Sequence, residues 1–266
     1  QIKRKQLPIK EQIMSDAPKL SVRGLTRRFG GLVAVNEVNL DLHQGEVHAV
    51  IGTNGAGKST LINMLSGEIA ASSGSITLEG RDVTQMPQPQ RAKAGIGRSY
   101  QRTTIFPEFT VLENCRLTAQ AQSRPRPWRI WEPAQHCDSS MARAQSALAR
   151  TGLTPHAERI AGSLSHGAKR QLEVAMCLAT EPQVLLLDEP LAGMGAEETE
   201  RMLDLLQELK KGHAVLLVEH DMDAVFRIAD RITVMVNGTV VATGTPDQIR
   251  NDPVVRTAYL GEEEHA

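Results

Sequence analysis

The chain has 266 residues, 41% of them hydrophobic, which predicts a globular protein of one large or two modest domains with a sizeable core. A formal net charge of −1 and an aromatic content of only 3% argue against a nucleic-acid partner, which would need basic patches and rings for base stacking. No apolar run approaches the roughly 18 residues of a membrane span, and the three cysteines form no CxxC pair, so we expect a protein of a reduced compartment that reaches a membrane only through a partner.

The first 18 residues are interpreted as an extension ahead of a domain that covers residues 19–262 and ends in a short acidic tail, residues 263–266. Residues 1–13 are basic and polar and lack the apolar stretch of a secretory signal. Because Met14 follows them, we interpret them as a tag, sequence translated from upstream or the tail of a fused partner.

Short strands follow from Leu20. Alternating apolar and polar residues over 20–29 and 33–42 predict antiparallel ribbons that are covered on one face. Phe29 ends the first of these strands. In a chain with so few aromatic residues, its ring could stack on a nucleotide base or belong to an ordinary core, and the residues alone leave both roles open.

The segment from Gly52 to Thr60 carries the strongest motif of the chain, G-x-x-x-x-G-K-[ST], between an apolar strand pattern and an amphipathic helix. Glycines let the backbone fold tightly round an anion with its N–H groups turned inward, and the following helix brings its positive end to the same place. Lys58 would reach the β and γ phosphates of a nucleotide, and Ser59 would be a ligand of Mg²⁺. The nucleotide-binding residues expected here are Gly52, Thr53, Asn54, Gly55, Ala56, Gly57, Lys58, Ser59 and Thr60.

The region after the loop changes from strands to helices. Gln101 lies at the end of a possible strand, and a helix is predicted to begin near Thr110. We interpret residues 104–164 as a helical insert in an α/β core. The prolines of residues 123–133 interrupt its helices, and the arginines and tryptophans there suggest either an interaction surface or a solvated linker.

Ser165 is a favourable N-cap for a helix that stops before Pro182. Gly167, close to that start, would leave backbone N–H groups exposed to an anion. An ordinary capped helix has the same pattern, so the residues alone do not decide for a second anion site.

Two apolar runs, residues 184–187 and 214–218, suit strands that are buried on both faces of a parallel sheet. The carboxyl ends of such strands form the edge where α/β proteins bind ligands. Alternation should send Asp188 toward Mg²⁺ and Glu189 to the opposite side, toward the water that attacks the γ-phosphate. His220 ends the second strand and could hydrogen-bond that phosphate.

The last part of the chain contains two strong local patterns. Asn237-Gly238 between two apolar runs predicts a β-hairpin. Thr245-Pro246 predicts the start of a short helix.

Taken in order, these elements resemble the ATP-binding subunit of ABC transporters over residues 19–261. The resemblance rests on six elements in the family's order: Phe29 as the adenine-stacking aromatic, GTNGAGKST as Walker A, Gln101 as the Q-loop, LSHGAKRQ as the signature, LLLDEP as Walker B and His220 as the switch histidine. It implies an α/β fold, in which a P-loop NTPase (RecA-like) core carries an antiparallel β subdomain and a helical subdomain. It also implies ATP and Mg²⁺ as cofactors, with Gln101 joining Ser59 and Asp188 at the metal.

More narrowly, GIGRSYQ, LSHGxxRQLE, LAGM, LVEHDM and the ending AYLG are similar to importers of the branched-chain amino acid type. Related cassettes serve urea and short amides, so those cargoes stay open. The resemblance implies a bacterial or archaeal source and a peripheral position on the cytoplasmic face of the inner membrane.

The same resemblance implies a nucleotide sandwich between two ATPase subunits, identical or paralogous. Each ATP would lie between the Walker A loop of one subunit and Ser165 and Gly167 of the other, and binding would close the dimer. Lys58 would offset developing charge, Glu189 would polarise water, and His220 and Gln101 would sense the γ-phosphate. Transmembrane permease subunits would dock near Gln101, and an extracytoplasmic solute-binding protein would take part indirectly.

Two segments depart from the common family pattern. In the signature, His166 replaces a glycine and Ala168 replaces the glutamine of LSGGQ, so a side-chain contact is lost while the backbone contacts remain. Gly195 stands where the D-loop usually has Asp or Asn, which puts a polar contact across the dimer in doubt.

Other classes of function fit the sequence less well. Soluble ABC ATPases of DNA repair or translation usually carry two cassettes or a long coiled coil, and a P-loop GTPase would carry an N-K-x-D base reader; the chain has neither. A degenerate, non-hydrolysing ATP-sensing subunit stays open because of Gly195.

Overall fold

The computed structural model describes residues 17–101, 104–122 and 138–257. Within these residues the larger sheet has the strand order β10–β9–β3–β8–β7–β6. Its strands are β10 (Thr239–Gly244), β9 (Arg231–Val236), β3 (Val47–Gly52), β8 (Ala214–Val218), β7 (Val184–Asp188) and β6 (Ile96–Arg98). All neighbouring pairs are parallel except β9 and β10, which form a hairpin.

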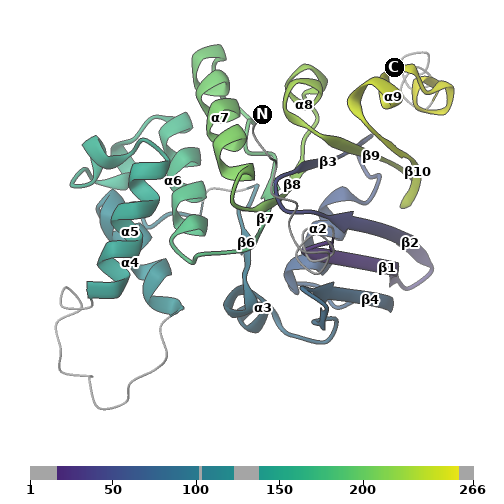
Figure 1. Cartoon of the computed structure of the whole chain (residues 1–266), viewed down its shortest axis with the longest axis horizontal. Helices are drawn as coiled ribbons and strands as arrows, with labels where there is room; N and C mark the ends of the chain where they lie inside the picture. The colour runs from purple at the N-terminus through teal and green to yellow at the C-terminus, as the bar shows by residue number, and fades with distance from the viewer. Residues whose placement is uncertain (1–16, 102–103, 123–137, 258–266) are drawn as a thin grey trace, which may run out of the picture.

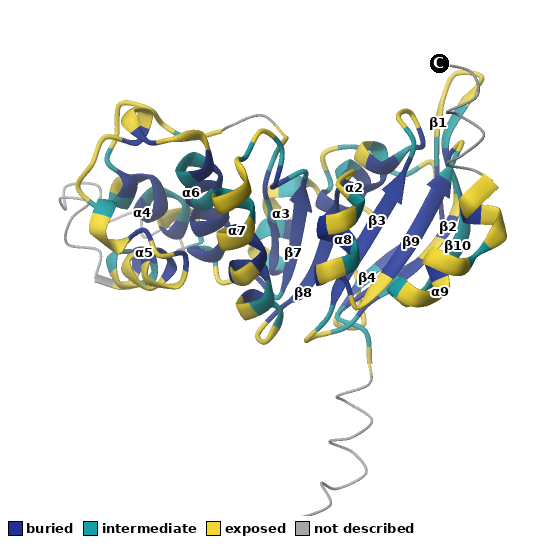
Figure 2. Ribbon diagram, turned by 90° about the horizontal axis from the view of Figure 1, so that it is seen from above, coloured by how far each residue is buried: buried dark blue, intermediate teal, exposed yellow. Residues whose placement is uncertain are grey.

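The central strands are buried on both faces, as their continuous apolar runs predict. Every residue of β3, β7 and β8 is buried. Along β7, Val184 and Leu186 face one hydrophobic core while Leu185 and Leu187 face another. Figure 2 shows these strands in dark blue, in contrast to the helices over them, which are partly yellow. The sheet is therefore the middle layer of the molecule.

One face of this sheet is covered by α2 (Lys58–Ser66) and by a second, antiparallel sheet. That sheet has the order β2–β1–β4–β5. Its strands are β2 (Leu32–Leu42), β1 (Leu20–Phe29), β4 (Ser73–Leu78) and β5 (Arg81–Asp82). Leu61, Ile62 and Leu65 of α2 share a core with both sheets, which confirms the prediction of antiparallel ribbons covered on one face.

The opposite face carries further helices of the core and a helical lobe (Figure 1). Helices α7 (Ala196–Lys210), α8 (Met222–Ile228) and α9 (Pro246–Asn251) lie over the sheet, whereas α3 (Gln88–Ala94) precedes β6. The lobe contains α4 (Val111–Ala121), α5 (Asp138–Arg150), two 3₁₀ turns (Thr154–His156 and Ala161–Ser163) and α6 (His166–Leu178). A single hydrophobic core runs from Leu148 of α5 through Leu172 of α6 to Leu187 of β7.

Several local predictions are confirmed in detail. Thr110 caps α4, since its hydroxyl accepts from the Glu113 N–H at 3.1 Å. The Asn237-Gly238 turn joins β9 to β10 with φ angles of 47° and 80°, the left-handed pair that a tight hairpin needs. Thr245 caps α9.

Other expectations need correction or stay outside the described residues. The strand before Gln101 ends at Arg98, so Gln101 lies in the irregular segment that follows. The proline-rich segment 123–133 and the extension 1–13 lie outside the described residues. No helix in the described part of the chain is long and apolar enough to cross a bilayer.

Candidate active site

The glycine-rich loop of residues 52–58 joins β3 to α2. It is packed so closely that two of its glycines have no room for a side chain. A Cβ atom on Gly52 would lie 2.2 Å from the carbonyl oxygen of Met235 in β9. A Cβ atom on Gly57, whose φ is +97°, would lie 2.4 Å from the carbonyl oxygen of Ala34 in β2. Strands of both sheets therefore hold the loop against the start of α2.

The C-terminal hairpin supports the same loop. The N–H of Gly238 donates to the carbonyl oxygen of Ala56 at 3.0 Å. The sequence predicts this hairpin, but nothing in it indicates that the turn rests on the loop.

Lys58 turns back over the loop that precedes it. Its Nζ donates to the carbonyl oxygen of Thr53 at 3.0 Å and to that of Gly52. Burial lowers the pKa of Lys58, and the nearby charges of Glu189 and Asp188 oppose that shift. The charges of both acids, Asp188 and Glu189, thus act on the ammonium group.

The start of α2 is open to an anion. Gly57 is its N-cap and supplies no side-chain acceptor for the first N–H groups of the helix. Asn54, Gly55 and Ser59 are exposed, and Thr60 is half-buried. A phosphate group at this position would accept from N–H groups that the protein leaves without a capping side chain.

Asp188 ends β7 and is only 4% exposed. Its Oδ1 is buried with no hydrogen-bond partner among the described residues, and its Oδ2 lies 3.8 Å from Nη2 of Arg98. Burial raises the pKa of Asp188, while Arg98 lowers it. A buried carboxylate oxygen without a donor is costly, and a hard cation such as Mg²⁺ is a ligand that would satisfy it.

Glu189 has the left-handed backbone conformation, with φ of 49°, so strand alternation does not set its direction. The sequence predicts that strand alternation separates Glu189 from Asp188. That reason is wrong, because β7 ends at Asp188, one residue before Glu189. A non-glycine residue held in this conformation costs on the order of 1 kcal/mol, and such residues are concentrated at functional sites. The N–H of Glu189 donates to the Val218 carbonyl at 2.9 Å, which fixes it beside the end of β8.

Gln101 and His220 both approach the Glu189 carboxylate. Nε2 of Gln101 donates to Oε2 of Glu189 at 2.9 Å. Nδ1 of His220, whose side chain is 63% exposed, lies 4.0 Å from Oε1. The fold thus gathers Lys58, Asp188, Glu189, Gln101 and His220 at the carboxyl edge of the parallel sheet, from four separate stretches of sequence.

Glu219 is a further residue of this edge that sequence reasoning did not select. It is fully buried, and its Oε1 accepts from the Leu191 N–H at 2.8 Å while its Oε2 accepts from the His220 N–H at 3.2 Å. Burial raises the pKa of this carboxyl, which the two N–H groups oppose. Glu219 therefore ties the segment after Glu189 to the histidine.

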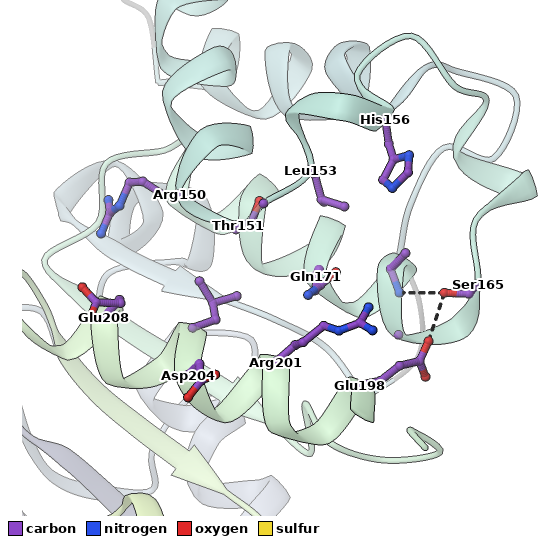
Figure 3. A pocket seen from close by; sticks show the side chains of 14 residues that line it. Arg150, Thr151, Leu153, His156, Ser165, Gln171, Glu198, Arg201, Asp204 and Glu208 are labelled. Carbon is purple, nitrogen blue, oxygen red and sulfur yellow. Dashed lines mark hydrogen bonds between the residues drawn. The ribbon is translucent and has the colours of Figure 1, made fainter. Parts of the chain in front are cut away.

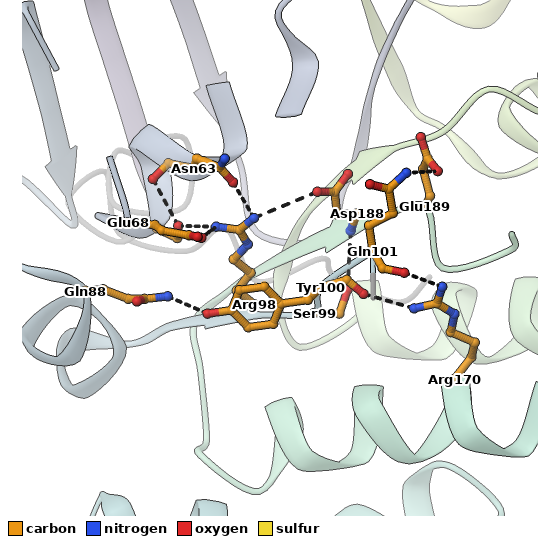
Figure 4. A network of polar contacts seen from close by, with 11 residues as sticks. Asn63, Glu68, Gln88, Arg98, Ser99, Tyr100, Gln101, Arg170, Asp188 and Glu189 are labelled. Carbon is orange, nitrogen blue, oxygen red and sulfur yellow. Dashed lines mark hydrogen bonds and ion pairs between the residues drawn. The ribbon is translucent and has the colours of Figure 1, made fainter. Parts of the chain in front are cut away.

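Arg98 is a second residue that the sequence does not single out. Its Nη1 donates to Oγ of Ser66 at 2.7 Å and to Oε2 of Glu68 at 2.6 Å, so it joins β6 to the end of α2 (Figure 4). Its guanidinium also lies 4.6 Å from the Tyr100 ring centroid. Together with its proximity to Asp188, these contacts link both Walker segments to the stretch before Gln101.

The predicted residues Ser165 and Gly167 line a separate hollow of about 480 Å³ between α5, α6 and α7 (Figure 3). Ser165 caps α6, since its Oγ accepts from the Ala168 N–H at 3.2 Å, which confirms the predicted helix start. The same hydroxyl donates to Oε1 of Glu198 in α7 at 3.0 Å.

Phe29, at the tip of the β1–β2 hairpin, is 43% exposed and has the Arg27 guanidinium 4.5 Å from its ring centroid. Neither Phe29 nor the Ser165–Gly167 pair takes part in the contacts described above for Lys58, Asp188 and Glu189.

A family model described as ABC transporter matches residues 35–192, and one described as branched-chain amino acid ATP-binding cassette transporter matches residues 239–265. The chain belongs to the ABC transporter family. The high-affinity branched-chain amino acid transport ATP-binding protein LivG of Escherichia coli K12 is 44% identical over 251 residues, which covers 92% of this chain and 98% of LivG. The corresponding protein BraF of Pseudomonas aeruginosa is 42% identical over 252 residues, with the same coverage.

Solved ABC cassettes share the fold. A nucleotide-free ATP-binding cassette from an ABC transporter superimposes with a TM-score of 0.81 at 30% identity and covers 91% of this chain and 98% of its own. A cassette in its ADP conformation gives the same TM-score and identity, with coverages of 92% and 99%. These matches confirm the α/β P-loop NTPase fold with its antiparallel and helical parts.

The departures of this ABC cassette from the common signature have local consequences. Nε2 of His166 donates to the carbonyl oxygen of Ala192 at 3.0 Å, so the substituted histidine links the signature to the segment after the DE pair. Gly195 is the N-cap of α7, and its N–H donates to Oε2 of Glu198 at 3.4 Å. Glu198 thus contacts both segments in which the sequence departs from the family.

Proposed function

We propose that this chain is the ATP-hydrolysing subunit that energises a membrane importer for branched-chain amino acids. The observation that carries the proposal is the position of Lys58, Asp188 and Glu189 at one sheet edge, after the parallel strands β3 and β7, beside a glycine loop and a helix start without a capping side chain. A triphosphate bound there would face a cation and two acids at once.

The chain's own residues suit ATP with Mg²⁺. The loop N–H groups and Lys58 would hold the β and γ phosphates, and Ser59, Asp188 and Gln101 would hold the metal. The metal would neutralise charge on the phosphate oxygens during transfer. The unpartnered Oδ1 of Asp188 supports this assignment.

Hydrolysis transfers the γ-phosphoryl group to water and releases ADP and phosphate. Glu189 would accept a hydrogen bond from the attacking water and orient it in line with the leaving oxygen. Gln101 and His220, which lie 2.9 Å and 4.0 Å from its two oxygens, would hold the carboxylate and sense the γ-phosphate. Lys58 would stabilise charge that develops in the transition state.

We infer that two such subunits act as a pair, with Ser165 and Gly167 of each contacting the ATP of the other. Phe29 would stack on the adenine, since its ring is exposed at the tip of the hairpin that packs on the loop. Whether the second subunit is a copy or a paralogue does not change these roles.

The permease subunits would dock beside the Q-loop, and a solute-binding protein would act through them. A hollow of about 250 Å³ between α3, α4 and α6, lined by Tyr100, Thr118 and Met176 among others, supports this position. Its closeness to Gln101 would let a docked permease segment act on the catalytic edge. The subunit would then work as a peripheral protein on the cytoplasmic face of the inner membrane.

The cargo is inferred from relatives such as LivG and BraF, whose names specify branched-chain amino acid transport. Urea or a short amide is the alternative cargo. Proteoliposomes that contain the complete importer would take up labelled leucine if the inference is correct, and uptake of urea instead would overturn it.

The hydrolytic assignment is tested with Glu189→Gln. The variant should bind ATP as the wild type does and lose turnover by about 100-fold or more, because the amide is a poor acceptor for the attacking water. Turnover equal to that of the wild type would exclude Glu189 as the residue that polarises water. An inactive wild type that still binds ATP would favour a sensing subunit.

A further inference from the structure

The signature helix α6 holds the backbone of the Q-loop through one arginine. Nη1 of Arg170 donates to the carbonyl oxygen of Tyr100 at 2.9 Å, and Nη2 donates to that of Gln101 at 2.6 Å (Figure 4). Because the two nitrogens belong to one planar group, they fix the position and the orientation of two successive backbone carbonyls.

Glu173, one turn further along α6, binds the backbone of Thr104, three residues beyond Gln101. Its Oε1 accepts from the Thr104 N–H at 2.7 Å, and its Oε2 accepts from Nη1 of Arg170 at 2.9 Å. The two side chains are 7% and 3% exposed. Residues three apart lie on the same face of a helix, so α6 presents them as one unit.

Burial of the Arg170–Glu173 ion pair costs free energy, so we infer that the pair does more than fill space in the core. Removal of both ionic groups from water carries a desolvation cost, and burial raises the pKa of the Glu173 carboxyl. The pair offsets that cost with hydrogen bonds to the backbone of Tyr100, Gln101 and Thr104, none of which lies in a strand ladder that would satisfy these groups.

Gln101 is held at both ends as a result. Its carbonyl is bound to α6, and its side chain reaches Oε2 of Glu189. A shift of the Gln101 backbone would carry the amide away from the carboxylate, since the side chain has a fixed reach.

We propose that Arg170 and Glu173 act as a clamp through which helix α6 positions Gln101, and through Gln101 the carboxylate of Glu189, for ATP hydrolysis. Both are positioning residues, because neither contacts Glu189 itself. The inference rests on the proposed function, since it concerns the rate of that reaction.

The test is a double-mutant cycle on ATP turnover by the full chain, with Arg170→Met, Gln101→Ala and the double variant. Arg170→Met should lower kcat about tenfold, because small misplacement of a catalytic group has effects of this size, and should leave KM for ATP within about twofold. Gln101→Ala keeps Glu189 and so retains measurable turnover. In that background Arg170→Met should lower kcat by less than about twofold, because the residue through which it acts is already gone.

Arg116→Met is the matched control. Arg116 is a buried arginine of the same lobe, 7% exposed, whose Nη1 donates to Gln120 on its own helix at 3.1 Å. Its loss should leave kcat unchanged even where it lowers stability. A fall in kcat equal to that of Arg170→Met would show that loosening the lobe is sufficient, and would overturn the clamp.

The clamp would also be overturned if the two substitutions acted independently on kcat. In that case Arg170→Met would lower kcat a further tenfold in the Gln101→Ala background. If Arg170→Met does not fold, as judged by thermal unfolding, the same cycle with Arg170→Lys and with Glu173→Gln decides by the same criterion. Absence of turnover in the wild type would overturn both the proposed function and the clamp, whereas an active wild type with additive effects would overturn the clamp alone.

Discussion

The hydroxyl of Ser165 donates to Oε1 of Glu198 at 3.0 Å, so a carboxylate of α7 lies across the start of the signature helix. A Cβ atom on Gly167 would lie 2.3 Å from the carboxyl carbon of Glu198. The N-terminus of a helix attracts anions, and here the anion is the carboxylate of Glu198 from the same chain. Under the proposed function this is the end of α6 that contacts the partner's γ-phosphate.

The first prediction concerns this carboxylate. Two anions cannot share one helix start without repulsion, so ATP held between subunits must displace or repel Glu198. Glu198→Gln keeps an acceptor oxygen for Ser165 but removes the charge. The ATP concentration for half-maximal turnover should fall about threefold, and the difference from the wild type should shrink at high salt.

Glu197→Gln is the control for that measurement. Glu197 is the neighbouring exposed acid and pairs with Arg201 at 3.1 Å. It should leave the half-maximal ATP concentration as in the wild type. A Glu198→Gln variant that needs as much ATP as the wild type, or more, would show that the carboxylate does not oppose nucleotide binding.

Much of the catalytic edge could be predicted because its signals are local. Neighbours within a few residues determine the loop from Gly52 to Thr60 and the acids at the end of β7. Elsewhere in the chain, the caps Ser165 and Thr245 have equally local signals. The same is true of buried strands, whose apolar runs are continuous. The fold class was implied by the family resemblance that these short patterns carry in order.

The residues that sequence reasoning missed are those whose partners lie far along the chain. Arg98 and Arg170 each bind groups more than 25 positions away, in segments that the fold alone brings together. Glu189 shows the limit of a periodicity argument. Strand alternation was used to predict the direction of its side chain, but its left-handed backbone conformation does not follow that alternation. Tertiary packing decides such positions, and no local pattern records it.

The second prediction concerns Glu219. Glu219→Ala would leave the buried N–H group of Leu191 and the part-buried N–H group of His220 without their acceptor. The free energy of unfolding should fall by about 1–3 kcal/mol, because an unsatisfied buried donor such as the Leu191 N–H costs about that much. Chemical denaturation measures this change. Glu208→Ala, which removes an exposed acid of α7, should leave the midpoint unchanged, and an equal loss in both variants would show that the buried hydrogen bonds of Glu219 contribute nothing.

The third prediction concerns Gly57. Gly57→Ala would place a Cβ atom 2.4 Å from the Ala34 carbonyl at a φ of +97°, so the loop would have to move. We expect a loss of about 2 kcal/mol or more in unfolding free energy and the loss of ATP binding, measured by denaturation and by titration with an ATP analogue. Gly212→Ala is the control, because a Cβ there meets nothing within 4 Å. That variant should be as stable as the wild type or slightly more so; unimpaired binding by Gly57→Ala would contradict the tight packing of the loop.

The last prediction concerns pH and His213, which joins the helical lobe to the sheet. Nδ1 of His213 lies 2.8 Å from the Pro182 carbonyl, which only accepts, so Nδ1 carries the proton and Nε2 accepts from Nη2 of Arg150 at 2.8 Å. A second proton would place two cations in contact. Burial lowers the pKa of His213, and Arg150 lowers it further, while the Pro182 carbonyl opposes the shift.

The folded protein therefore binds this proton less readily than the unfolded chain. The contribution of His213 to stability is present above the unfolded pKa of about 6.5 and is lost as the pH falls through that value toward the lower folded pKa. His213→Gln can keep both hydrogen bonds without titrating. Its free energy of unfolding should therefore decline less than that of the wild type between about pH 7 and pH 5. His156→Gln, in the helical lobe, is the reference for a histidine substitution that leaves the Arg150 contact in place. If the free energy of unfolding of His213→Gln declined as much as that of the wild type, His213 would not titrate in this range.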